Sequence, residues 1–177
     1  MIHIVLYEPE IPQNTGNIMR TCMAFDMRLH LIEPLGFSLD DKHLKRAGMD
    51  YIDEVFWTIY PDWKAFAEVN HGSMYFLTRY GFHTPSECNF KGDIDKGEDI
   101  YLVFGKESTG IDKAILKEHL DRCIRIPMVP HARSLNLSNC VAILAYEAIA
   151  ATEFAGLSDR EVQKGADFLL HYDEANQ

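Results

Sequence analysis

Three separated segments of the chain place polar side chains beside glycine and proline. Their candidate chemical residues are, in chain order, Asn14, Arg20, Glu107, Ser134 and Asn136. This set holds no histidine or cysteine nucleophile; it offers a guanidinium, a carboxylate, two amides and a hydroxyl. Such groups bind and orient a polar substrate and assist proton transfer. The residue types therefore predict positioning chemistry rather than covalent catalysis.

The first segment runs from residue 8 to residue 20. Pro9 and Pro12 restrict its backbone, and Gly16 permits a tight turn into a helix. Asn14 and Arg20 supply hydrogen-bond donors near the start of that helix, where anions are favoured. The spacing alone fits either an anion-binding helix start or a capped helix with a solvated arginine.

The second segment, Gly-Lys-Glu-Ser-Thr-Gly at residues 105–110, follows the apolar run Ile100–Phe104. Its glycines let a ligand approach the backbone, although a plain turn is the alternative. It is not a nucleoside triphosphate loop, because Ile100 stands where that motif needs glycine and Glu107 follows the lysine. No Gly-x-Gly-x-x-Gly follows any predicted strand, which argues against a nicotinamide or flavin site.

The third segment covers residues 126–139 and leads into an Ala-rich helix. Pro127 and Pro130 stiffen its first half, and Ser134, Asn136 and Ser138 gather at the helix start. One of these polar residues would suffice as a cap. The others indicate either a functional site or solvated side chains.

The elements that position these segments alternate between apolar strands and helices, which predicts an α/β fold with a mostly parallel sheet and helices on both faces. Ile18, Cys22 and Phe25 form one apolar helix stripe, from which Arg20 points away. We expect helices at 62–69, 112–120 and 137–154, and a last helix opened by Ser158. The expected strands are Ile2–Leu6, Leu29–Ile32, Met74–Leu77, Ile100–Phe104 and Cys123–Ile126.

The composition restricts the class of protein. The 177 residues, 47% of them hydrophobic, suit one domain. The chain shows no targeting segment and no membrane-spanning run, so we expect a cytoplasmic protein. Four scattered cysteines and eight histidines without metal-ligand spacing predict no metal site. The formal charge of −10 is unusual for a nucleic-acid binder, but residues 153–177 alone carry six acids and two bases.

Together the three segments resemble the motifs of the SPOUT (SpoU-TrmD) RNA methyltransferases, in their small TrmL type. The resemblance spans about residues 1–154. The matching motifs are Pro-x-Asn-x-Gly-Asn-x-x-Arg at 12–20, Gly-x-Glu-x-x-Gly at 105–110, and Ile-Pro-Met leading to Ser-Leu-Asn-x-Ser at 126–138.

The resemblance implies a SPOUT domain at 1–155 with a C-terminal deep trefoil knot, followed by an acidic, partly helical extension at 156–177. It further implies a homodimer and an S-adenosylmethionine cofactor, which becomes S-adenosylhomocysteine. Arg20 matches the catalytic arginine of the family, supported by Asn14, while Glu107, Ser134 and Asn136 match other polar residues of its site. The residues that the resemblance places around the cofactor are Leu77, Gly105, Ile126, Met128 and Ser134.

The implied activity is 2′-O-methylation of the wobble nucleotide of leucine tRNAs. Alternatives are another tRNA position, ribosomal RNA, or a non-catalytic RNA-binding or assembly factor. Lys42, Lys45 and Arg46 would share one helix face and, with Arg133 and His131, contact RNA; solvated charges are the alternative for the first three. The aromatic residues between 56 and 63 fit core or dimer packing better than base stacking.

Overall fold

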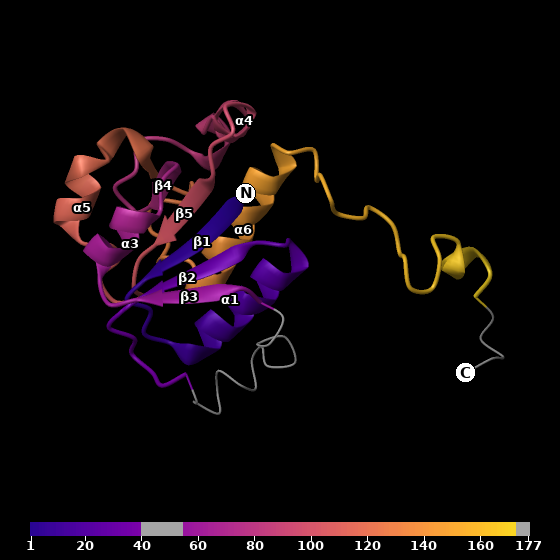
Figure 1. Cartoon of the computed structure of the whole chain (residues 1–177). Helices are drawn as coiled ribbons and strands as arrows, with labels where there is room; N and C mark the ends of the chain where they lie inside the picture. Colours follow the sequence, from indigo (N-terminus) through magenta and orange to yellow (C-terminus); the bar gives the residue numbers. More distant parts are fainter. Residues whose placement is uncertain (40–54, 173–177) are drawn as a thin grey trace.

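A six-stranded sheet, parallel at every pairing, forms the centre of the computed structural model, which describes residues 1–39 and 55–172 (Figure 1). Along the sheet the strands follow the order β3-β2-β1-β5-β4-β6. Every residue of β5 is buried, as expected of an inner parallel strand covered on both faces. The strands are β1 (Ile2–Tyr7), β2 (Arg28–Ile32), β3 (Trp57–Tyr60), β4 (Ser73–Leu77), β5 (Ile100–Phe104) and β6 (Cys123–Ile124).

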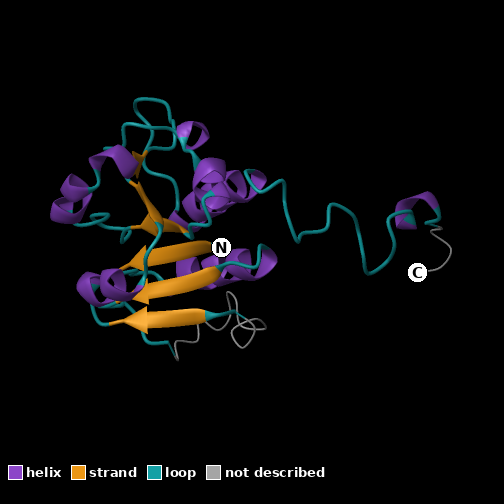
Figure 2. Cartoon of the chain, turned by 45° about the horizontal axis from the view of Figure 1, so that its top comes forward, coloured by secondary structure: helices purple, strands orange, loops and turns teal. Residues whose placement is uncertain are grey.

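Helices cover both faces of the sheet (Figure 2). Ile4 and Leu6 of β1 belong to the apolar core that includes side chains of α1 and α6, whereas Val5 belongs to the core that includes Phe66 and Leu116. This alternation follows from the two-residue period of a strand. The helices are α1 (Pro12–Ala24), α4 (Phe90–Asp95) and α6 (Leu137–Ala150) on the first face, and α3 (Trp63–Val69) and α5 (Lys113–Glu118) on the second.

The predicted α/β class and the five predicted strands are confirmed, with β6 shorter than expected. β6 ends at Ile124, and Ile126 lies in the loop that follows. Strand β3 was missed because Thr58 is exposed and its neighbours are only partly buried, so the segment shows no clear apolar run. In the aromatic cluster, Trp63 packs against Phe66 and Phe76, in agreement with core packing.

Two predictions about the C-terminal region were wrong. The long helix ends at Ala150 rather than Phe154, and Glu153 and Phe154 adopt positive φ angles. No helix begins at Ser158, whose hydroxyl instead bonds to the backbone of Arg160 in a local turn. Of the described residues after 156, only 168–170 form a short 3-10 turn, and this segment extends away from the body (Figure 1).

Within residues 1–39 and 55–172, no helix has the length and apolar character needed to cross a membrane.

Candidate active site

The loops that follow β1, β5, β4 and β6 begin at the same edge of the sheet. The strand register pairs Leu6 with Phe104, Phe104 with Leu77, and Leu77 with Ile124. Because all strands are parallel, their carboxyl ends lie in a row, where open α/β sheets build their sites. The three motif segments therefore meet in space.

A chain of side-chain hydrogen bonds joins the three segments. The Asn14 amide donates to Glu107 Oε1 at 2.8 Å, and the Asn136 amide donates to Asn14 Oδ1 at 2.9 Å. Asn14 is buried, so its amide has little access to competing water. The structure thus brings together Asn14, Glu107 and Asn136, as the sequence predicts.

Helix α1 begins in an unusual way that leaves Asn14 available for this role. Its N-cap is Ile11, which has no side-chain acceptor, and Pro12 occupies the first turn. The Asn14 side chain points to Glu107 rather than capping its own helix. The alternative of a helix start capped by a side chain is therefore wrong for α1.

Asn136 does cap a helix in addition to contacting Asn14. Its Oδ1 accepts hydrogen bonds from the backbone N–H of Ser138 at 2.8 Å and from the Ser138 hydroxyl at 2.6 Å. The two ends of one amide thereby tie the start of α6 to the start of α1. Asn136 is therefore the predicted cap of α6, and the functional role of the segment stays a prediction.

The loop after β5 is a tight turn that presents Glu107. A Cβ atom on Gly105 would lie 2.2 Å from the backbone of Gly110 and Ile111, so only glycine allows the two strands of the turn to meet there. Lys106 and Gly110 form an isolated antiparallel bridge. Glu107, a residue of the candidate site, is therefore held in this turn.

Two carboxylates of the loop after β1 form hydrogen bonds with this turn. The sequence did not predict these contacts. Glu8 accepts from Lys106 Nζ at 2.5 Å, and Glu10 accepts from the backbone N–H and the hydroxyl of Ser108, both at 2.8 Å. The backbone N–H of Glu10 also donates to Glu107 Oε2 at 2.9 Å. These bonds lower the pKa of Glu10 and raise the pKa of Lys106, with the Ser108 and Glu8 contacts as the main causes.

The residues that the resemblance assigns to the cofactor lie along the same edge. Leu77 ends β4, Gly105 follows β5, and Ile126 and Met128 lie in the loop after β6; all four are partly buried. Ser134 is exposed in the same loop, and no hydrogen bond within the described part of the chain connects it to Glu107.

The predicted cationic residues are distributed over several elements. Arg20 is exposed on α1, six residues after Asn14, and opposite the buried Ile18 and Cys22 as predicted. His131 and Arg133 are exposed in the loop before α6. Lys42, Lys45 and Arg46 lie outside the described residues, so their shared helix face stays a prediction.

A second polar cluster lies on the face of the sheet that α3 covers. His3 Nδ1 and His30 Nε2 are 2.8 Å apart, and His30 Nδ1 lies 3.1 Å from the Tyr60 hydroxyl. His3 also stacks on Tyr101. Burial lowers the pKa of each histidine to about 4, so both are neutral at pH 7.

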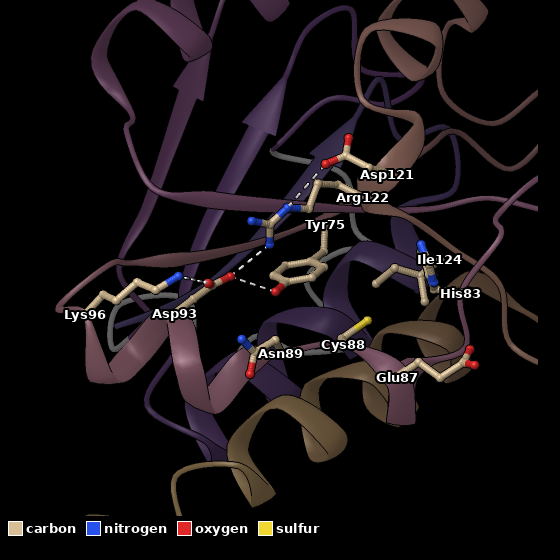
Figure 3. Close-up of a pocket in the computed structure, with 10 residues that line it drawn as sticks. All are labelled: Tyr75, His83, Glu87, Cys88, Asn89, Asp93, Lys96, Asp121, Arg122 and Ile124. Atoms are coloured by element: carbon tan, nitrogen blue, oxygen red, sulfur yellow. Dashed lines mark hydrogen bonds and ion pairs between the residues drawn. The ribbon is translucent and has the colours of Figure 1, made fainter.

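A cavity of about 250 Å³ lies beside Tyr75 and Ile124, away from the motif residues (Figure 3). Asp93 is its most buried charge and accepts from the Tyr75 hydroxyl at 2.7 Å, Arg122 at 2.8 Å and Lys96 at 3.3 Å. Burial alone would raise the pKa of Asp93, but these hydrogen bonds lower it overall. The Asp93 carboxylate therefore holds α4 against β4 and against the turn before β6.

Comparison with known proteins identifies the fold and the motifs together. The SpoU rRNA Methylase family matches residues 1–146, which include Asn14, Glu107 and Asn136. The chain is also 53% identical, over 156 residues, to a putative tRNA (cytidine(34)-2′-O)-methyltransferase of Listeria monocytogenes, covering 88% of this chain and 90% of the relative. The chain belongs to the SpoU methylase family.

Solved structures of methyltransferases share this fold. A putative RNA methyltransferase from Bacillus anthracis superposes with a TM-score of 0.83 at 48% identity, covering 92% of this chain and all of the other. The SpoU methyltransferase AviRb from Streptomyces viridochromogenes, in complex with the cofactor AdoMet, shares the fold with a TM-score of 0.70 at 20% identity, over 87% of this chain and 58% of the other. The resemblance to SPOUT enzymes of the TrmL type is confirmed.

Proposed function

We propose that this protein is a tRNA 2′-O-methyltransferase that transfers a methyl group from S-adenosylmethionine to the ribose of cytidine 34. The observation that carries the proposal is the hydrogen-bonded chain Glu107–Asn14–Asn136, which joins all three family motifs at one edge of the sheet. The 53% identical relative bears the name of this activity. Leucine tRNAs, with cytidine or modified uridine at the wobble position, are the proposed substrates.

The residues at this edge suit a sulfonium donor. Leu77, Ile126 and Met128 offer partly buried apolar contacts for an adenosine. The nearby ammonium of Lys106 is neutralised by Glu8, and Glu10 and Glu107 add negative charge that favours a bound cation. When bound, the donor supplies an electrophilic methyl group, so the protein itself needs no nucleophilic residue.

The protein's own residues orient the acceptor ribose. Arginine is protonated at neutral pH, so Arg20 serves by binding the ribose or an adjacent phosphate rather than as a base. Glu107 is held by donors on both carboxylate oxygens, Asn14 on one and the Glu10 backbone on the other. Asn136 and Ser134, on the loop from β6, complete the proposed site.

The proposed architecture includes a trefoil knot, a homodimer and a separate tail. The return of α6 against α1 and against the segment at 85–87 supports the knot. Ile143 and Tyr146 are 44% and 55% exposed on α6, which supports a dimer through α1 and α6. The family match ends at residue 146, which supports residues 156–177 as an extension outside the catalytic domain of residues 1–155.

A radiolabelled transfer assay tests the proposed activity. Purified protein is incubated with methyl-labelled S-adenosylmethionine and either bulk tRNA or ribosomal RNA. The proposal predicts label in the leucine tRNA fraction. Label in ribosomal RNA alone would support a different substrate, and no label with a donor-binding protein would support a non-catalytic RNA-binding factor.

A further inference from the structure

An exposed aromatic loop follows β4 at the same edge of the sheet as the candidate site. Tyr80 is 57% exposed and Phe82 is 71% exposed. Exposed aromatic side chains that are not buried by the fold commonly mark contact surfaces. This loop has no part in the family motifs described above.

The backbone of this loop is fixed along β6, although its side chains are exposed. Thr78 N–H donates to the Ile124 carbonyl at 2.9 Å, and Phe82 N–H donates to the Cys123 carbonyl at 3.1 Å. A Cβ atom on Gly81 would lie 2.2 Å from the carbonyl carbon of Ile124, so the glycine permits this close approach. The aromatic rings are therefore presented from a rigid base, which reduces the entropic cost of binding.

Cations surround the aromatic loop. The Arg79 guanidinium lies 5.8 Å from the centre of the Tyr80 ring, and Lys113 Nζ lies 5.5 Å from it. Arg125 donates to the Arg79 carbonyl at 2.6 Å. Within residues 1–39 and 55–172, no ion pair joins Arg79, Lys113 or Arg125 to a carboxylate, so their charge is available to a polyanion.

A pocket of about 260 Å³ lies beside the turn that carries Glu107. Lys106 and Lys113 both line it, together with Tyr7, Thr109, Gly110, Ile111 and Asp112. Lys106 belongs to the turn that carries Glu107, and Lys113 reaches the Tyr80 ring. Lys113 therefore links this pocket to the aromatic loop, whereas Lys106 is neutralised by Glu8.

We propose that Tyr80, with Phe82, Arg79, Lys113 and Arg125, forms a platform for an unpaired nucleotide that flanks the methylated one. Single-stranded RNA is recognised by bases stacked on aromatic side chains and by cations near the phosphates. This inference rests on the proposed function, since it names a surface for the same RNA. It also supplies cationic contacts in a chain whose net charge is −10.

The chain offers a matched control at the opposite edge of the sheet. Phe56 is 72% exposed, and Arg28 lies 5.8 Å from its ring centre. Both residues stand at the amino-terminal ends of strands, since Arg28 begins β2 and Phe56 precedes β3. Phe56→Ala thus removes an even more exposed aromatic side chain that also has an arginine neighbour, at the end of the strands opposite the candidate site.

The test measures the affinity of a fluorescein-labelled RNA hairpin, carrying the anticodon loop of a leucine tRNA, by fluorescence anisotropy. Tyr80→Ala should weaken binding about tenfold, because loss of one base–aromatic stack has an effect of that order. Tyr80→Phe and Phe56→Ala should bind as the unaltered protein does. The double variant Arg79→Gln with Lys113→Gln should reduce the slope of log affinity against log salt by about 2.

Calorimetry with S-adenosylhomocysteine separates this proposal from a role in cofactor binding. All of these variants should retain the affinity of the unaltered protein for that compound. If Tyr80→Ala weakened its binding and left RNA affinity intact, or if Tyr80→Ala matched Phe56→Ala toward RNA, the platform would be refuted. Failure of the unaltered protein to bind the hairpin would instead refute the proposed function.

Discussion

Two polar clusters of different kinds lie on the sheet. On the face covered by α3, His3 and His30 are buried among aromatic rings; the two ring nitrogens lie within hydrogen-bond distance of each other, and His30 lies within hydrogen-bond distance of the Tyr60 hydroxyl. At the carboxyl-terminal edge, Glu107 and Asn136 are less buried and lie on loops. His3 and His30 have strongly lowered pKa values because they are buried as a structural pair. The proposed chemistry lies elsewhere, where loops from distant parts of the chain converge.

The largest expected effect concerns Arg20, which is exposed on α1. Arg20→Ala should lower kcat about 100- to 1000-fold, which is the usual loss for one residue that stabilises charge in a transition state. The variant should fold and bind S-adenosylhomocysteine normally, because Arg20 is exposed. Arg160→Ala, an exposed arginine in the tail, serves as the control. Full turnover by Arg20→Ala would show that the positioning role is wrong.

The buried histidine pair should make the free energy of unfolding depend on pH. The unfolded histidines titrate near pH 6.5 and the folded ones near pH 4, so the unfolded state takes up protons first as the pH falls. The free energy of unfolding should therefore fall between pH 6.5 and 4, by about 3 kcal/mol for one histidine. Urea titrations at pH 7 and pH 4.5 measure this loss.

A substitution at His3 sharpens the pH experiment. His3→Gln cannot take up this proton, so its stability should depend less on pH over the same window. Its methyl-transfer rate at pH 7.5 should equal that of the unaltered protein. A changed rate with unchanged pH dependence of stability would contradict a structural role for the histidine pair.

Glu107→Gln should have a smaller effect than Arg20→Ala. A glutamine keeps one acceptor oxygen, so one of the bonds from Asn14 and Glu10 is lost. We expect about a tenfold fall in kcat, since a lost charged hydrogen bond costs roughly 1.5 kcal/mol. Glu118→Gln, at the end of α5, is the matched control, and equal activity of the two variants would contradict the proposed role.

The smallest expected effect is at Thr15, next to Asn14 in α1. Thr15 is fully buried, and its hydroxyl has no hydrogen-bond partner among the described residues. Thr15→Val removes this unsatisfied group at similar volume, so stability should stay equal or rise by about 1 kcal/mol. Thermal melts measure this effect, and a clear loss of stability would indicate a partner for that hydroxyl.

The sequence predicts the convergence of Asn14, Glu107 and Asn136 because parallel strands place all their carboxyl ends at one edge. The order of apolar runs also indicates the α/β class. It does not indicate the edge strand β3, since Thr58 is exposed and its neighbours are only partly buried.

The hydrogen bonds between the loops after β1 and β5 could not be predicted. Glu8 and Lys106 are 98 residues apart, as are Glu10 and Ser108, and no periodic pattern relates them. In the C-terminal tail, by contrast, the sequence pattern predicted a helix at Ser158 that the structure does not have. Ser158 and Glu161 have the spacing of a helix start, but Gly165 at a φ of 95° and the absence of a buried apolar face leave no support for a helix.

Mapping the methyl group within the RNA is the most direct test of the proposed 2′-O-methylation of cytidine 34. A leucine tRNA transcript with cytidine 34 is compared with one that carries 2′-deoxycytidine at that position, and the products are digested and analysed by mass spectrometry. We expect 2′-O-methylcytidine at position 34 of the first transcript and no methylation of the second. Equal methylation of both, or a methyl group on the base, would contradict it.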